Sequence, residues 1–243
     1  LVNTVRILHS INHINDNTIE IKKRFREIID GLDPQKREEQ IQNYLEKMTE
    51  IATKKLSETE TDILNEKKRM LIDLFSETWT KLQDESKKFL LTTEVVYDSI
   101  KGNKYIDYSP ACLPLTKALE RELFINLVAV SQDYCRENIG PDRKKWPGPL
   151  RQKYFMLGQL SQIYQNKKAR EILKNSIKLK CKENTLDQEC NLEKFIKGSQ
   201  HIKDEFRNKI AHMEEISLAI AQDCRKYILL KEKFLIEFMN MLK

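Results

Sequence analysis

The sequence has few of the residues that interrupt helices. Only six of its 243 residues are glycine and six are proline, and three of the prolines fall in one short stretch, at Pro141, Pro147 and Pro149. Proteins rich in β-strands and loops need more of both residues, because tight turns depend on them. No segment alternates apolar and polar residues as a half-buried strand does. The composition therefore predicts an all-α fold.

The chain also lacks the features of membrane and secreted proteins. No apolar run approaches the roughly 18 residues of a membrane span, and no signal peptide is present. We therefore expect no membrane partner. Since the chain starts with Leu1 rather than Met, we expect a fragment of a larger protein, with a regulatory or sensor domain outside it.

The cysteines do not form a metal-binding or disulfide pattern. Their number is odd and no two have CxxC spacing, which disfavours a structural zinc site and a disulfide framework. We expect reduced, mostly buried thiols in a cytoplasmic protein, with no metal and no other cofactor. A disulfide between Cys181 and Cys190 is the weaker alternative. The five cysteines are Cys112, Cys135, Cys181, Cys190 and Cys224.

Charged residues make up 33% of the chain, with 43 Lys and Arg against 37 Asp and Glu. The net charge of +6 permits contact with nucleic acid without requiring it, because so high a charge content is typical of solvated helix faces.

The first third of the chain predicts a long helical arm. Asp33 and Pro34 are a helix cap and a first helical residue, and apolar residues then recur at steps of four and three. Lys and Glu flank this stripe. We interpret residues 1–83 as a charged arm, either a helical hairpin or a coiled coil packed on itself or on a second copy; an arm that binds nucleic acid is the alternative. The stripe begins with Ile41, Leu45, Met48 and Ala52.

Residues 84–243 predict a helical domain. Apolar periodicity indicates helices over about 84–100, 115–134, 150–164, 169–179, 192–212 and 217–242. The Gly- and Pro-rich stretch 138–149 and the stretch 180–190 are expected to be loops.

One short stretch carries chemistry. Arg207-Asn208-Lys209-Ile210-Ala211-His212 places a permanent cation, a carboxamide and an imidazole within six residues. Imidazole transfers protons near neutral pH, and a guanidinium stabilises charge on a phosphate. Groups of this kind are what an enzyme needs to cut RNA without a metal.

The spacing alone is not sufficient evidence. Arg6 and His13 form a similar pair with nothing else to support it, and His9 with His13 lacks a third metal ligand. Geometry adds a constraint: Arg207 and His212 point about 140° apart on an ideal helix. Either the helix is distorted near Arg207, or a second copy of the chain completes the site. A structural role, with Arg207 paired to a glutamate and His212 buried, is equally compatible with the sequence.

The stretch Arg207-Asn208-x-x-Ala211-His212 resembles the R-N-x-x-A-H motif of HEPN domains (higher eukaryotes and prokaryotes nucleotide-binding). The stretches 91–94 and 113–120 resemble the first and second core helices of some bacterial members, so the resemblance covers about residues 84–243. Residues 1–83 match nothing in the family.

The resemblance implies a helical bundle that forms a homodimer through its motif helices. Many members are metal-independent endoribonucleases that act as toxins or in antiviral defence. By this resemblance His212 would be the general acid or base, Arg207 would hold the scissile phosphate and Asn208 would orient either of them. Glu120 would pair with Arg207 at rest. RNA would be the substrate, because the reaction uses its 2′-hydroxyl.

Two other interpretations stay open. The chain is either a non-catalytic HEPN-like module that binds nucleotides or proteins, or an unrelated helical assembly protein in which the motif is fortuitous.

Overall fold

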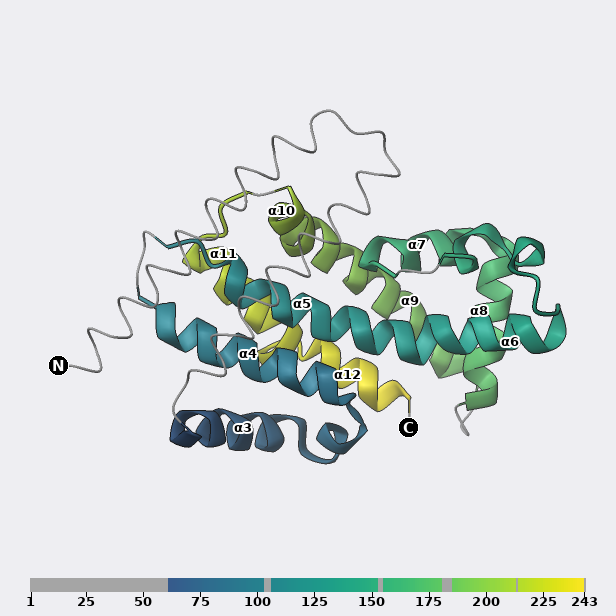
Figure 1. Ribbon diagram of the computed structural model, residues 1–243. Helices are drawn as coiled ribbons and strands as arrows, with labels where there is room; N and C mark the ends of the chain where they lie inside the picture. The colour runs from purple at the N-terminus through teal and green to yellow at the C-terminus, as the bar shows by residue number, and fades with distance from the viewer. Residues whose placement is uncertain (1–60, 103–105, 153–154, 181–184, 213, 243) are drawn as a thin grey trace.

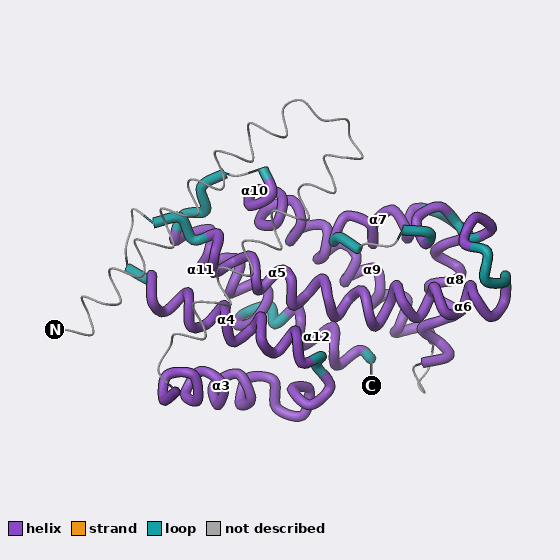
Figure 2. Tube along the Cα trace, viewed as in Figure 1, coloured by secondary structure: helices purple, strands orange, loops and turns teal. Residues whose placement is uncertain are grey.

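The described part of the computed structural model contains helices and turns and no strand, so the fold is all-α (Figures 1 and 2). The structure describes residues 61–102, 106–152, 155–180, 185–212 and 214–242. The stripe from Ile41, the pair Arg6 and His13 and a disulfide between Cys181 and Cys190 lie outside the described residues or side chains.

Two long antiparallel segments form the centre of the bundle. Helix α4 (Asp84–Ile100) packs along α5 (Ser109–Leu123), which continues through a π-helical turn (Phe124–Ala129) into α6 (Val130–Asn138). The remaining described helices pack around this pair: α3 (Thr61–Phe75), α7 (Leu157–Gln165), α8 (Lys167–Lys180), α9 (Thr185–Ile202), α10 (Asn208–Ala211), α11 (Leu218–Arg225) and α12 (Phe234–Met241).

One continuous hydrophobic core joins these helices. Leu90, Leu119, Leu173 and Leu235 are fully buried although they come from four different helices. At about 25 cal/mol per Å² of apolar surface removed from water, such a core is the main source of stability in a bundle of this kind. It also fixes the position of the motif helix, since Ile202, Phe206 and Ile210 belong to it.

Helix α3 belongs to this same core. It packs against α4, and Leu71 and Phe75 are buried together with the residues of the later helices. The part of the expected arm that the structure describes is therefore in contact with the bundle. The domain boundary at residue 83 stays a prediction.

Four expected element limits were wrong. Helix α7 begins at Leu157 rather than at residue 150, because the chain first forms a short 3₁₀ turn at Gly148–Leu150. Helix α5 begins at Ser109 rather than Leu115, because Pro110 fits the first helical turn, where a backbone donor is not needed. Helix α9 begins at Thr185, inside the expected loop 180–190; the spacing Thr185-x-x-Gln188, typical of helix starts, is the signal that was overlooked.

The fourth error concerns the last helix, which was expected to be continuous over 217–242. It is divided into α11, a π-helical turn (Lys226–Leu230) and α12. The break falls at Lys231–Lys233, where Lys233 has a left-handed φ of 48°. Lys and Glu favour helices, so the sequence gives no sign of this break.

The described cysteines have the expected state. Cys112, Cys135 and Cys224 are free thiols and all three are buried. Burial raises the pKa of the Cys135 thiol to about 11, so this group stays protonated and unreactive at neutral pH.

Candidate functional site

The motif lies at the end of a helix that changes its winding just before it. Helix α9 is followed by a π-helical turn (Lys203–Arg207), in which the backbone N–H of Asn208 donates to the carbonyl of Lys203. Helix α10 then resumes normal winding, and the backbone N–H of His212 donates to the carbonyl of Asn208 at 2.7 Å. Single π turns are frequent at functional sites. This turn is a distortion near Arg207, one of the two alternatives that the helix geometry left open, and it lies directly before Asn208.

The distortion does not bring Arg207 and His212 to one face. Arg207 is 6% exposed, whereas His212 lies at the C-terminal end of α10 and is exposed. The π turn ends at Arg207, so the five steps from Arg207 to His212 follow ordinary helical winding. The two side chains therefore keep the wide separation of an ideal helix.

The Arg207 guanidinium is held inside the bundle by α5 and the start of α7. Its Nε lies 3.5 Å from Oε1 of Glu120, and its Nη2 donates to the sulfur of Met156 at 2.7 Å. Glu120 is buried and its other oxygen lies 3.3 Å from Lys117. The expected pairing of Glu120 with Arg207 is thus present.

This ion pair has poor hydrogen-bond geometry. Neither Nε of Arg207 nor Oε1 of Glu120 makes a hydrogen bond, although both atoms are buried. A buried ion pair offsets its cost of desolvation only when its hydrogen bonds are well formed. The two charges therefore neutralise each other, but no hydrogen bond between the two side chains fixes the orientation of the guanidinium.

Asn208 and His212 occupy the solvent side of the helix. The side-chain amide of Asn208 donates to Asp204 at 3.4 Å, one turn earlier, and not to His212. Among the described residues, the His212 imidazole makes no hydrogen bond or ion pair. It is accessible to a ligand from solvent.

A buried aspartate that the sequence reasoning missed anchors the segment after the motif. Oδ1 of Asp107 accepts hydrogen bonds from the backbone N–H of Ser109 at 3.0 Å, the hydroxyl of Ser109 at 2.7 Å and the backbone N–H of Ile216 at 3.0 Å. The N–H of Tyr108 also donates to the carbonyl of Ile216. Asp107 therefore caps α5 and fixes the chain four residues beyond His212.

A second unpredicted pair joins α4 to α11. Arg225 donates from Nε and Nη2 to the two oxygens of Glu94 at 2.7 and 2.6 Å, and Glu94 is 1% exposed. The hydrogen bond to Glu94 raises the pKa of Arg225. Two parallel hydrogen bonds between fully charged groups form the strongest kind of side-chain pair, so this pair fixes how the C-terminal helices pack on α4.

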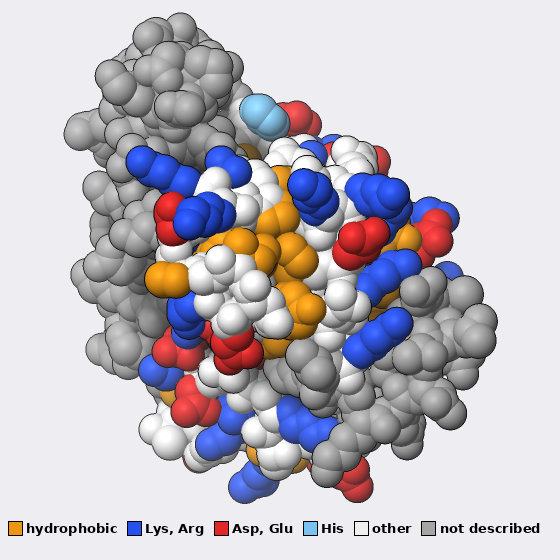
Figure 3. All heavy atoms as spheres, turned by 90° about the vertical axis from the view of Figure 1, so that its right-hand side faces the viewer, with side chains coloured by type: hydrophobic (Ala, Val, Ile, Leu, Met, Phe, Trp, Pro, Cys, Tyr) orange, Lys and Arg blue, Asp and Glu red, His pale blue; other side chains and the backbone are white. Residues whose placement is uncertain are grey.

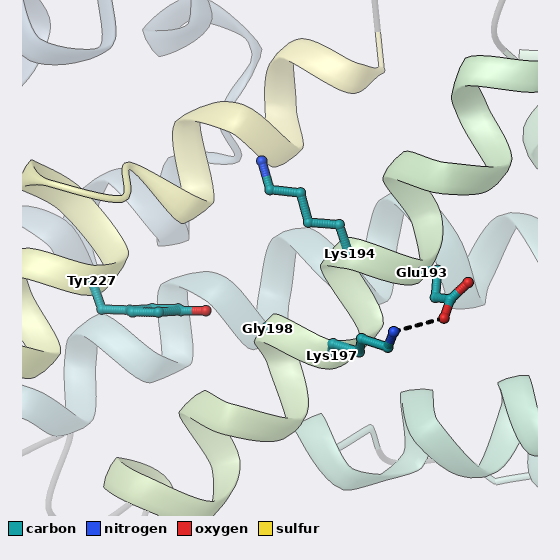
Figure 4. A pocket seen from close by; sticks show the side chains of 5 residues that line it. All are labelled: Glu193, Lys194, Lys197, Gly198 and Tyr227. Atoms are coloured by element: carbon teal, nitrogen blue, oxygen red, sulfur yellow. Dashed lines mark ion pairs between the residues drawn. The ribbon is translucent and has the colours of Figure 1, made fainter.

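The described residues also form a shallow surface cavity of about 540 Å³ between α9 and the π turn after α11. It is lined by Glu193, Lys194, Lys197, Gly198 and Tyr227 (Figure 4). Lys197 is paired with Glu193, and the Tyr227 ring lies flat toward Gly198. No motif residue lines this cavity.

Charges around the motif are balanced. Lys203 lies beside Asp204, Lys209 is paired with Glu205 at 3.1 Å, and Glu214 and Glu215 follow. The described residues around His212 therefore do not form a strongly cationic surface.

Comparison with known proteins adds no assignment: no protein-family model, curated protein or solved structure matches the chain. Among the described residues, no three His, Cys, Asp or Glu side chains are grouped to hold a metal ion. None of the described helices is long and apolar enough to cross a membrane.

Proposed function

We propose that this chain is a metal-independent endoribonuclease of the HEPN type, with a site that two copies complete. The observation that carries the proposal is the exposed His212 imidazole, free of partners among the described residues, at the end of a helix that is distorted immediately before Asn208. The motif residues keep the order and types that the resemblance requires.

The chemistry needs a base, an acid and charge stabilisation. His212 accepts the proton of a ribose 2′-hydroxyl as its oxygen bonds to phosphorus, or donates a proton to the departing 5′-oxygen as the P–O5′ bond breaks. The products are a 2′,3′-cyclic phosphate and a 5′-hydroxyl. A 2′-hydroxyl is required, so RNA is cut and DNA is not.

The position of Arg207 supports a composite site. A guanidinium that is 6% exposed and paired with Glu120 does not reach a phosphate beside His212 of the same chain. A two-fold arrangement of motif helices brings His212 of one copy toward the other copy, and opening of the loosely bonded ion pair frees the guanidinium. We propose that a single copy of the chain, outside a dimer, is therefore nearly inert.

The proposed setting is that of a toxin or antiviral ribonuclease in the cytoplasm. A regulatory or sensor domain outside this chain would control such an enzyme.

The test is cleavage of a single-stranded RNA by the purified chain in excess EDTA. The wild-type chain cuts under these conditions, and His212→Ala lowers the rate by about a hundredfold or more, the usual effect of removing a general acid or base. His201→Ala is the matched control, because His201 is also exposed on the same continuous helix. Equal loss in both variants, or no loss in His212→Ala, contradicts the proposal.

Mixing two inactive variants tests the composite site. If one site takes Arg207 from one copy and His212 from the other, a mixture of Arg207→Gln and His212→Ala recovers about a quarter of wild-type activity, because half of the dimers are mixed and each has one intact site. If both residues come from one copy, the mixture stays inactive. Thermal unfolding checks that Arg207→Gln is folded.

A second candidate is a non-catalytic interaction module. It is favoured by the burial of Arg207 and by the balanced charge around His212. A dimer structure with the two His212 side chains far from the two-fold axis would support it.

A further inference from the structure

The positive charge of the chain is concentrated in one region away from the motif. Residues 130–180 contain twelve Lys and Arg against four Asp and Glu, whereas the whole chain contains 43 against 37. The remaining residues therefore carry 31 basic and 33 acidic side chains. All of the chain's positive surplus comes from α6, α7, α8 and their connecting loops.

This region forms one end of the bundle, at the right of Figure 1, and Figure 3 shows that end face on. Lys and Arg side chains border both sides of a band of apolar side chains, and some acidic side chains lie among them. The exposed cations come from the loop before α7 and from the start of α8, at Lys144, Lys145, Lys167 and Lys168. We call this surface the basic end face.

Lysines elsewhere on the bundle often have acidic neighbours. Lys87 lies 3.0 Å from Asp84, Lys209 lies 3.1 Å from Glu205, and Lys67 is paired with Asp98. Such pairs are typical of a solvated helix face. By contrast, among the described residues no ion pair involves Lys144, Lys145, Lys167 or Lys168. Asp142 and Glu171 lie on the same segments, but cations outnumber carboxylates in this region, so the basic end face attracts a polyanion.

The apolar band between the cations selects among polyanions. Among the apolar residues of the region 130–180, Ile139 is 39% exposed, and Tyr164 and Ile172 are partly buried. The guanidinium of Arg170 lies 5.3 Å from the Tyr164 ring centroid. Single-stranded nucleic acid places its phosphates on cations and its base faces on apolar or aromatic surface. A duplex hides its base faces. A membrane favours projecting aromatic anchors, whereas Trp146 in this region is 1% exposed.

We infer that the basic end face is a docking surface for single-stranded RNA, separate from the residues that cut it. The choice of RNA over DNA rests on the proposed function. Helix α7 connects the two places: Met156, just before it, contacts Arg207, and Lys167 follows its end. Its nine residues span about 13 Å, so a few nucleotides of RNA cover the distance from the basic end face to the Arg207 end of the motif.

The experiment measures binding of a fluorescent single-stranded RNA by anisotropy, with the His212→Ala chain used throughout so that the RNA stays intact. The test variant reverses three charges on the basic end face, Lys144→Glu, Lys145→Glu and Lys168→Glu. A control variant reverses three exposed lysines on α3, the following 3₁₀ turn and α4: Lys68→Glu, Lys81→Glu and Lys88→Glu. Both variants have the same net charge, so their difference reports position alone.

We expect the basic-end-face variant to bind at least tenfold more weakly, and the control variant to bind within about threefold of the parent. Loss of three phosphate contacts also lowers the slope of log Kd against log salt by about 2. Equal weakening by both variants, or no weakening by either, overturns the inference. Tighter binding of duplex RNA, or binding to phosphatidylserine vesicles with no binding to RNA, also overturns it.

The outcomes separate this inference from the proposed ribonuclease. If RNA binds through the basic end face but the wild-type chain does not cut it, the docking surface is supported and the ribonuclease proposal is refuted. The charge-reversed variants are also tested for cleavage with His212 restored. If they cut RNA as well as the wild-type chain and bind it as tightly as the parent, the ribonuclease proposal is supported and the docking surface is refuted.

Discussion

Gly198 is the position in the motif-bearing helix where a single methyl group has the most predictable effect. It lies in the C-terminal part of α9, and a Cβ built there falls 2.1 Å from Cε2 of Phe234. The Phe234 ring is buried and packs edge-on against Phe195 at 5.3 Å between centroids. The ring also stacks on Tyr227 at 5.8 Å between centroids, so Gly198→Ala has to displace this packed ring or force α9 and α12 apart.

The expected free energy follows from two opposing contributions. Replacing glycine by alanine inside a helix stabilises it by about 1 kcal/mol. Overpacking a well-packed core costs about 1–3 kcal/mol, and the upper part of that range applies because 2.1 Å is far inside van der Waals contact. We therefore expect Gly198→Ala to lower the free energy of unfolding by about 1–2 kcal/mol, which lowers Tm by roughly 2–8 °C for a domain of this size.

Gly158 in α7 provides the matched control. A Cβ built at Gly158 meets only the flexible end of Lys203, at 2.9 Å, and the lysine can swing aside. Gly158→Ala should be neutral or stabilising by about 0.5 kcal/mol. Both variants are measured by urea denaturation and differential scanning calorimetry. If the two substitutions change stability equally, the packing of α9 against Phe234 described above is wrong.

Three further predictions concern ion pairs and anchors. Arg225→Ala should cost about 3 kcal/mol in urea denaturation because it leaves the Glu94 carboxylate buried and unpaired; the double variant with Glu94→Ala should lose less than the sum of the single variants, and additivity would exclude a coupled pair. Asp107→Ala should cost about 2–3 kcal/mol, with Asp107→Asn milder because an oxygen acceptor remains, so equal losses would contradict the anchoring role. Although burial acts to raise it, hydrogen bonds from Lys101 and Lys67 hold the pKa of Asp98 below its usual value; the stability that this carboxylate contributes is present above its unfolded pKa near 3.9 and is lost as pH falls through the lower folded value. The free energy of unfolding, measured between pH 5 and pH 2, should therefore fall less steeply with pH for Asp98→Asn than for the wild-type chain. The same dependence on pH in both chains would refute this.

Helix content was predictable because apolar periodicity and the scarcity of glycine and proline are local properties. The limits of α4, Asp84 to Ile100, agree with the expected range 84–100. The interruptions were not predictable. The π turns at Lys203–Arg207 and Lys226–Leu230 and the left-handed Lys233 occur in sequences that favour regular helix. They arise from packing between helices, and the amino-acid sequence alone does not show which helices will be in contact.

The candidate site, too, was predictable in part: its residue types were, but their burial was not. The sequence supplied Arg207, Asn208 and His212 and an expected partner for Arg207 in Glu120, which the structure places 3.5 Å away. It did not reveal that Arg207 is buried while His212 is exposed, because burial depends on α5 and α7 rather than on the motif. Asp107 was missed because its partner, Ile216, is 109 residues away and contributes only a backbone N–H. The spacing Asp107-x-Ser109, typical of a local turn, was the available signal.

The measurement that tests the central claim most directly is the chemical nature of the RNA ends after cleavage. A synthetic single-stranded RNA is incubated with the chain in EDTA and the products are weighed by mass spectrometry. The account predicts a 2′,3′-cyclic phosphate on one fragment and a 5′-hydroxyl on the other, with neither formed by His212→Ala. Fragments with 5′-phosphate ends, or identical products from His212→Ala, would contradict it.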